Sequence, residues 1–262
     1  MKKLNISIFL LLACLFLHRA HAQDGMALVS GTINKGTTRT VILFEVIEGK
    51  KAEYASIKLS DDNRFAFALP SVKEGFYYIS DQSKNNFTRV YLKRGDRLEV
   101  EINKDGYEVV KGSAENKLLH DWFAASYPVT YPAVNWMQDS STYTTYFPKL
   151  ETFVKQLPAF KSKVKTKNAQ FNRLMNLAID TDIEYAAMHF LLVPNTIHPK
   201  KEQYPAYYRQ IIQPNKFTCA DLLQLGEGIE AMTTYATFNM LMNGMDARPA
   251  NRLQANANLI AN

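Results

Sequence analysis

The cysteines decide which redox chemistry this 262-residue chain can support. Of its two cysteines, Cys14 lies in an apolar run near the N-terminus, which leaves Cys219 alone in the rest of the chain. A dithiol oxidoreductase needs a second thiol to resolve the mixed disulfide that the first one forms. The sequence Cys-Ala-Asp-Leu at 219–222 does not supply it. We therefore predict that the chain lacks a catalytic cysteine pair.

The surroundings of Cys219 allow two interpretations. Thr218, followed three residues later by Asp221, matches a capping box, which would place Cys219 at the start of a helix where the dipole favours a thiolate. A lone cysteine beside Phe217 and before Leu222 is more typical of a small buried hydrophobic residue. We therefore expect Cys219 to be buried and inert, with the activated thiol as the alternative.

Asp182 and His189 form a second candidate site. They are seven residues apart, so on a helix they share a face two turns apart, with Tyr185 between them. This spacing suits metal binding or acid–base chemistry, but two ligands fall short of the three or four of a stable zinc site. Polar groups on an apolar face commonly satisfy each other. We therefore favour a structural role and predict no metal and no cofactor.

An aromatic group forms the third candidate site. It consists of Trp122, Tyr127, Tyr131 and Trp136, which could stack against a sugar or a peptide. Aromatic residues next to prolines also serve to hold a loop against a domain. The chain has no Gly-x-Ser-x-Gly elbow, Gly-rich phosphate loop or His-Glu-x-x-His motif. We therefore predict no catalytic residues.

The first half of the chain has the pattern of short strands. Phe65, Phe67 and Leu69 alternate with smaller or charged residues, as in a half-buried strand, and clusters of Gly, Asn, Asp and Pro separate the apolar segments. We expect strands at 27–32, 39–46, 52–59, 64–69, 76–80, 88–92, 97–102 and 107–110. Strands at this spacing predict an antiparallel β-sandwich of about 90 residues.

After Gly112 the apolar spacing becomes helical. Ser113 can cap a helix that continues through Phe123, and a loop rich in aromatic residues and prolines is expected at 127–141. We expect further helices at 143–157, 169–193, 204–212, 219–225 and 228–242, with Pro194 ending the third helix of this second half. The predicted fold class is α+β, with a sandwich domain at 23–112 followed by a mostly α-helical region at 113–262.

The N-terminus has the layout of an export signal. Two lysines precede an apolar run at 4–17, and Ala-His-Ala at 20–22 suits a signal peptidase that would leave Gln23 as the first residue. The alternative is a lipoprotein, because the residues before Cys14 loosely match a lipobox. The run is too short to span a bilayer, which takes roughly 20 apolar residues. We predict export to the periplasm or cell envelope, with membrane attachment only through lipid on Cys14.

Charge argues against a nucleic-acid partner. Removing residues 1–22 takes away three basic residues and lowers the formal net charge from +6 to +3. Basic residues alternate along one short stretch, at Lys161, Lys163, Lys165 and Lys167, without the interleaved aromatic residues of a nucleic-acid platform. We expect this stretch to be a solvated loop or helix end.

Five segments of the first half resemble a known family. They are Val-Ser-Gly-Thr at 29–32, Asp-Asn-Arg-Phe-Ala-Phe at 62–67, Gly-Phe-Tyr-Tyr-Ile at 75–79, Leu-Lys-Arg-Gly-Asp-Arg-Leu at 92–98 and Val-Lys-Gly-Ser-Ala-Glu-Asn at 110–116. The segments are similar to the DUF4369-type amino-terminal domain of Bacteroidetes cell-envelope proteins. In that family the domain commonly precedes a helical segment, which 168–199 and 204–212 resemble more loosely. A thioredoxin-like domain related to TlpA and ResA, with a Trp-Cys-x-x-Cys motif, then follows.

The resemblance implies a non-catalytic amino-terminal region of an exported thiol-disulfide oxidoreductase, which positions a redox domain or its client protein. The family's catalytic residues have no counterparts here, and 251–262 has the pattern of a polar helix that begins without a compact ending. We therefore expect the chain to stop short of a thioredoxin-like domain. The alternative is a stand-alone envelope module that binds a peptide, a glycan or a protein partner through the sandwich loops or the aromatic loop.

Overall fold

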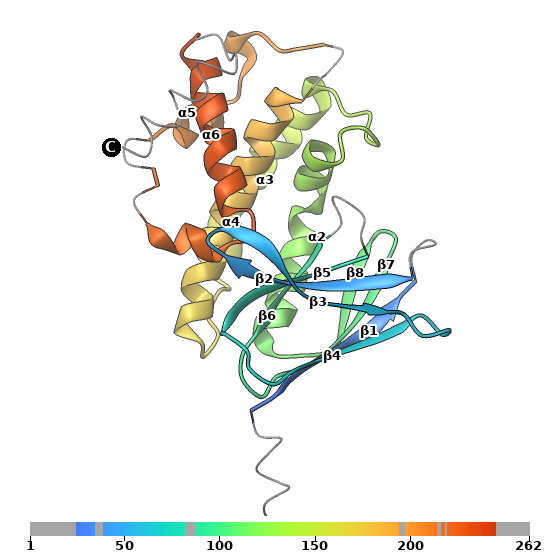
Figure 1. Ribbon diagram of the computed structural model, residues 1–262. Helices are drawn as coiled ribbons and strands as arrows, with labels where there is room; N and C mark the ends of the chain where they lie inside the picture. The colour runs from blue at the N-terminus through green and yellow to red at the C-terminus, as the bar shows by residue number, and fades with distance from the viewer. Residues whose placement is uncertain are drawn as a thin grey trace, which may run out of the picture.

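The computed structural model describes residues 25–34, 39–81, 87–193, 197–213, 216–217 and 219–244. Within these residues two four-stranded sheets precede a helical half, which confirms the α+β class with an N-terminal β region (Figure 1). The predictions made for residues 1–24, for Pro194 and Thr218, and for 251–262 lie outside the described residues. In the described part of the chain, no helix combines the length and apolarity needed to cross a membrane.

The strands lie within two residues of their predicted bounds. They are β1 (Ala27–Ile33), β2 (Thr40–Ile47), β3 (Lys50–Lys58), β4 (Arg64–Leu69), β5 (Gly75–Ser80), β6 (Phe87–Leu92), β7 (Arg97–Asn103) and β8 (Gly106–Lys111). One sheet has the order β4-β1-β7-β8 and the other the order β3-β2-β5-β6. On β4 the predicted alternation is confirmed, because Phe65, Phe67 and Leu69 are buried while the residues between them are exposed.

One strand pair differs from the predicted antiparallel arrangement. β1 and β7 pair in parallel, with Leu28 opposite Arg97, whereas the other pairs in the described residues are antiparallel. The first sheet is therefore mixed. The alternation of apolar residues could not reveal this, because side chains alternate with period two whichever way the neighbouring strand runs.

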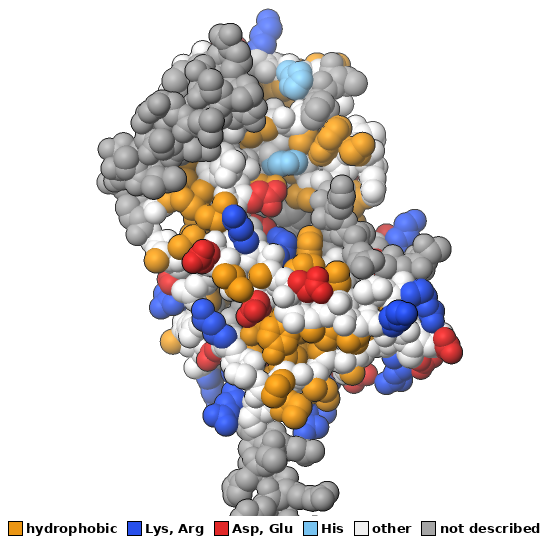
Figure 2. Space-filling model, viewed as in Figure 1, with side chains coloured by type: hydrophobic (Ala, Val, Ile, Leu, Met, Phe, Trp, Pro, Cys, Tyr) orange, Lys and Arg blue, Asp and Glu red, His pale blue; other side chains and the backbone are white. Residues whose placement is uncertain are grey.

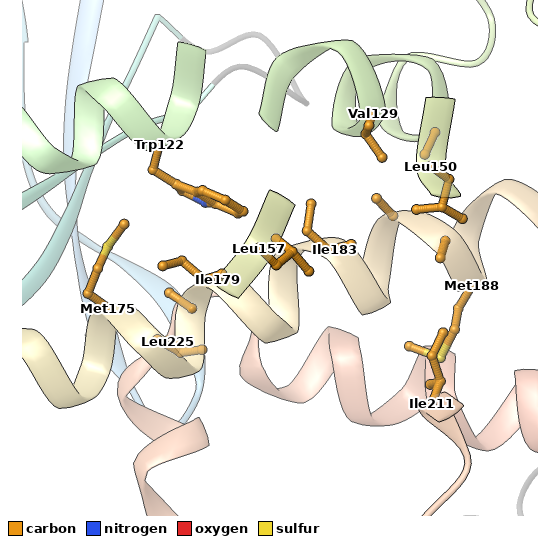
Figure 3. Packing of buried hydrophobic residues seen from close by; sticks show 14 of the residues in the cluster. Trp122, Val129, Leu150, Leu157, Met175, Ile179, Ile183, Met188, Ile211 and Leu225 are labelled. Atoms are coloured by element: carbon orange, nitrogen blue, oxygen red, sulfur yellow. The ribbon is translucent and has the colours of Figure 1, made fainter. Parts of the chain in front are cut away.

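The helical half is built around one long central helix. The helices are α2 (Ala114–Val134), α3 (Tyr143–Lys161), α4 (Ala169–Leu192), α5 (Ala206–Ile211) and α6 (Gly228–Met242), with short 3-10 helices η1 (Lys201–Gln203) and η2 (Ala220–Gln224). α4 contacts α2, α3, α5 and α6. Figure 3 shows Met175, Ile179 and Ile183 of α4 among apolar side chains of its neighbours, and all three are fully buried. α4 therefore forms the centre of the helical core.

Helix α2 extends eleven residues past its predicted end. The expectation of a loop at 127–141 was wrong for its first part, because Pro128 and Pro132 both lie inside the helix. Each proline removes a backbone hydrogen bond. Val129 and Ala133 are buried in the helical core, so the packing of one face of the helix outweighs that loss.

The sheet β3-β2-β5-β6 is buried on both faces along β5. Tyr77 and Ile79 belong to the core between the two sheets, whereas Phe76 and Tyr78 belong to the core of the helical half. This explains why the sequence of β5 is almost uniformly apolar instead of alternating. This sheet therefore packs against the other sheet on one face and against the helices on the other (Figure 1).

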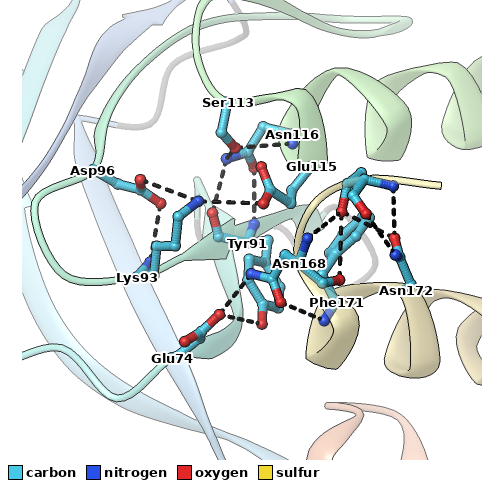
Figure 4. A network of polar contacts seen from close by, with 11 residues as sticks. Glu74, Tyr91, Lys93, Asp96, Ser113, Glu115, Asn116, Asn168, Phe171 and Asn172 are labelled. Atoms are coloured by element: carbon cyan, nitrogen blue, oxygen red, sulfur yellow. Dashed lines mark hydrogen bonds and ion pairs between the residues drawn. The ribbon is translucent and has the colours of Figure 1, made fainter. Parts of the chain in front are cut away.

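A polar network joins the outer strand β6 to the starts of two helices (Figure 4). The backbone N–H of Tyr91 donates to Oδ1 of Asn116, and Nδ2 of Asn116 donates to the Tyr91 carbonyl, both at 2.8 Å. Asn116 thus pairs with the free edge of β6 as a neighbouring strand would. At the start of α4, Asn168 caps the helix and donates to Glu74 at 2.6 Å, and Glu74 also accepts from the Tyr91 hydroxyl.

Candidate functional site

A cavity of about 440 Å³ lies between the sheet β3-β2-β5-β6 and helices α2, α4 and α6. Its walls include aromatic side chains from both halves of the molecule, among them Phe87 of β6, Trp122 of α2 and Tyr185 of α4. Five charged residues also line it, and these are Lys51, Arg89, Asp182, Glu227 and Glu230. In Figure 2 side chains of both charges lie close together near the boundary of the two halves. The volume falls within the range of small-molecule sites.

Arg89 and Asp182 form the central contact of the cavity. Nη1 and Nη2 of Arg89 each donate to a different carboxylate oxygen of Asp182, at 2.8 Å. The indole Nε1 of Trp122 donates to Oδ2 of the same carboxylate, also at 2.8 Å. Two parallel charge-assisted hydrogen bonds fix both distance and orientation. Strand β6, helix α4 and helix α2 therefore meet at one carboxylate.

Glu227 receives donors from the other side of the cavity. Its Oε1 accepts from Nζ of Lys51 at 2.9 Å, and its Oε2 accepts from Nη2 of Arg89 at 3.0 Å and from the hydroxyl of Tyr78 at 2.7 Å. The backbone N–H of Gly226 in turn donates to the Tyr78 oxygen at 3.0 Å. Arg89 thus bridges the two carboxylates, and the ion pairs form one connected network.

The local backbone explains how Glu227 comes so close to the sheet. The N–H of Gly49 donates to the Leu223 carbonyl at 2.7 Å, and the N–H of Ile229 donates to the Gly49 carbonyl at 3.1 Å. Gly49 has φ 76°, a conformation that favours glycine. A Cβ on Gly228 would lie 2.1 Å from a backbone carbonyl oxygen, so only glycine fits directly after Glu227.

The network keeps Glu227 and Arg89 charged. Burial alone would raise the pKa of Glu227, but Arg89, Lys51 and the hydrogen bond from Tyr78 lower it to about 2. Burial likewise would lower the pKa of Arg89, yet Asp182, Tyr78 and Glu227 hold it well above its ordinary value. Burial is also the main reason that the pKa of Tyr78 lies well above its usual range. At neutral pH these groups therefore hold their protonation states instead of exchanging protons.

No family model matches the chain, and no curated protein matches it. What the site can do must therefore be argued from its geometry.

Asp182 and His189 lie on one face of α4, as their spacing predicted, and both line the cavity. They do not satisfy each other, however, which corrects one part of the structural interpretation. Asp182 is held by Arg89 and Trp122, and Nδ1 of His189 lies 2.8 Å from the carbonyl oxygen of Ala133. In the described part of the chain, no three His, Cys, Asp or Glu residues are grouped so as to hold a metal ion.

The four predicted aromatic residues separate into two pairs. Trp122 and Trp136 line the cavity. Tyr127 and Tyr131 lie outside its lining and stack on each other one helical turn apart on α2, with ring centroids 4.9 Å apart and an interplanar angle of 28°. Because the segment is a helix instead of a loop, the four rings do not form one surface. Of these four aromatic residues, only the two tryptophans line the cavity.

The structure does not bury Cys219, so the expectation of a buried hydrophobic residue was wrong. Cys219 is exposed and lies at the N-cap of η2, where its backbone is extended. Leu222 and Leu225 provide the burial of this segment. Lys216 forms an ion pair with Glu184 at 2.5 Å. The described surroundings therefore give the thiol neither a second sulfur nor a partner from Lys216.

Sequence reasoning missed Lys51, Arg89 and Glu227. The signals that could have found two of them are local: Arg89 is a charged residue within the otherwise largely apolar strand β6, and Glu227 stands between Gly226 and Gly228. Nothing in the sequence around Lys51 separates it from its surface neighbours. Their convergence depends on contacts between segments more than 90 residues apart in the chain.

Proposed function

We propose that this chain is a non-catalytic binding module of a cell-envelope protein, and that the cavity between the sheet and the helices holds a small ligand or the end of a peptide. One observation carries the proposal: a 440 Å³ space with aromatic walls lies between the two halves, and its central charges are already paired with one another. A pre-formed pocket that combines aromatic side chains with fixed polar groups is a usual form of a ligand site.

The state of the carboxylates favours binding over catalysis. Asp182 accepts three hydrogen bonds and Glu227 accepts three. A general acid or base needs a pKa near the working pH and room to reach the proton that it moves. Glu227, with a pKa of about 2, is ionised at neutral pH and fully occupied by donors. The carboxylates of Asp182 and Glu227 therefore have a structural role in the cavity.

The two tryptophans provide a direct test. Trp122 and Trp136 are the only tryptophans in the sequence, and both line the cavity. Tryptophan emission, excited selectively over that of the tyrosines, therefore reports on the cavity. We expect at least one member of a library of tripeptides and disaccharides to produce a saturable change in tryptophan emission. A library in which no member changes the emission would contradict the proposal.

A matched pair of variants makes the test specific. Thr130 lines the cavity, so Thr130→Phe places a ring inside it and should abolish the fluorescence change. Ala124 is an exposed residue of the same helix and does not line the cavity, so Ala124→Phe should bind as the wild type does. Thermal unfolding of both variants checks that they are folded. Equal binding by Thr130→Phe and wild type would place the ligand elsewhere.

Two further proposals follow from the sequence and have their own tests. The proposal that a thioredoxin-like domain follows this region is tested by the coding sequence beyond residue 262, where a Trp-Cys-x-x-Cys motif is expected. The proposal of export is tested by mass spectrometry of the mature protein, which should begin at Gln23 or carry lipid on Cys14. In such a protein the cavity would hold a segment of the client protein beside the redox domain.

A further inference from the structure

We propose that the cavity selects a ligand that carries a cationic amino group on an apolar body. This inference rests on the proposed binding function and adds the chemical class of the ligand. It starts from the charges of the lining. Lys51 and Arg89 are matched by Glu227 and Asp182, which leaves Glu230 as the one lining charge without an opposite partner among the described residues.

Glu230 has one oxygen engaged and one available. It lies one turn after Glu227 on α6, and its Oε1 accepts a hydrogen bond from the hydroxyl of Tyr185 at 2.6 Å. That hydroxyl is neutral and does not cancel the charge of the carboxylate, since burial and Glu230 itself raise the pKa of Tyr185. No described residue donates to Oε2. Glu230 is exposed, so water reaches this oxygen, and an ammonium group of a ligand would replace that water and pair with the charge.

The aromatic walls suit a cation as well. The cavity already holds two cations against rings: Nζ of Lys51 lies 5.0 Å from the ring centroid of Tyr78 and 4.7 Å from that of Phe87, and the guanidinium of Arg89 lies 5.7 Å from that of Tyr78. Trp136 lines the same cavity and, of the aromatic side chains, tryptophan attracts cations most strongly.

His189 adds an acceptor to the same wall. The carbonyl oxygen of Ala133 can only accept a hydrogen bond, so the nearby Nδ1 of His189 carries the proton. In the neutral ring Nε2 is then an acceptor. The ring of Tyr185 packs beside that of His189, with centroids 5.3 Å apart, and the hydroxyl of Tyr185 donates to Glu230. Tyr185 therefore contacts both His189 and Glu230. Both acceptors suit a group that donates hydrogen bonds.

Three probes that share a phenyl ring on a short chain separate the effect of charge from that of the apolar body. They are 2-phenylethylamine, which is cationic at pH 7, 2-phenylethanol, which is neutral, and 3-phenylpropionate, which is anionic. Each is titrated into the full chain and followed by tryptophan emission. We expect dissociation constants on the order of millimolar for such small ligands. The amine should bind about tenfold more tightly than the alcohol, and the acid should bind most weakly.

Two variants assign the preference to its cause. Glu230→Gln should lower the affinity for the amine about tenfold and leave that for the alcohol unchanged. The control Glu151→Gln removes an exposed carboxylate of α3 that does not line the cavity, and it should change neither affinity. Thr130→Phe should abolish binding of all three probes, which shows that the signal comes from the cavity.

The outcomes distinguish this inference from the proposed function. If the alcohol or the acid binds as tightly as the amine, the preference for a cation is wrong and the cavity remains a ligand site for a neutral or anionic molecule. If Glu230→Gln leaves the amine unaffected, the preference is equally overturned. If none of the three probes changes the tryptophan emission, the inference fails, whereas the proposed binding function is decided by the library of tripeptides and disaccharides.

Discussion

Arg89 and Asp182 lie 93 residues apart in the chain and meet through two hydrogen bonds of 2.8 Å. This pair joins the outer strand β6 to the central helix α4 and therefore connects the two halves of the molecule. Only 15% of the Arg89 side chain and 18% of the Asp182 side chain are exposed. Water compensates little for the loss of either partner, so the pair is a structural joint as well as a wall of the cavity.

Replacing one member of the pair should destabilise the protein strongly. Asp182→Asn removes the charge that faces Arg89, so we expect the free energy of unfolding to fall by about 3 kcal/mol. Urea denaturation measures it. The double variant with Arg89→Met removes both charges and should recover part of the loss. The exposed pair of Arg39 and Asp61 is the control, since Asp61→Asn should cost under about 1 kcal/mol. Equal costs at the two sites would contradict a structural joint.

Asn116 should be needed to protect the edge of β6. Asn116→Ala leaves the backbone N–H and carbonyl of Tyr91 without their partner, and we expect a loss of about 2 kcal/mol of stability. Hydrogen exchange at the Tyr91 amide should become faster. Asn116→Asp keeps an acceptor for that amide and should slow its exchange again without restoring full stability. An unchanged exchange rate in Asn116→Ala would show that another group covers this edge.

The stability of the protein should depend on acid through Glu227. Its pKa in the folded protein is about 2, below the ordinary 4.5, so its contribution is fully present above pH 4.5 and is lost as the pH falls toward 2. This difference corresponds to roughly 3 kcal/mol. Glu227→Gln should therefore be less stable than wild type at pH 7, and the gap should close between about pH 5 and pH 2. A gap that stays constant over this range would contradict the assignment.

Features that depend on neighbouring residues in the chain can be predicted from the sequence, whereas features that depend on contacts between distant segments cannot. Strand β4 and helix α6 follow from local apolar spacing, and their bounds agree with prediction at both ends. The continuation of α2 through Pro128 does not follow from local spacing, because it depends on packing against α4. The same holds for the site. Asp182 could be placed on the face of a helix, but its partner Arg89 comes from a strand whose position relative to α4 no local pattern contains.

Cys219 should behave as an ordinary exposed thiol. In the folded protein it should react with a disulfide reagent such as 5,5′-dithiobis(2-nitrobenzoate) without prior unfolding, since its side chain is exposed. Cys219→Ser should change the free energy of unfolding by less than about 0.5 kcal/mol, as expected for a surface substitution.

The same thiol should not reduce insulin catalytically. A turnover cycle needs a second thiol to release the mixed disulfide, and no other cysteine lies among the described residues. Thioredoxin is the positive control for the assay, and Cys219→Ser is the negative control. Turnover by the wild-type chain that disappears in Cys219→Ser would show that the thiol is catalytic and would contradict its assignment as a non-catalytic residue. Slow reaction of the thiol in the folded protein, with rapid reaction after unfolding, would instead show that the segment around η2 covers it in solution.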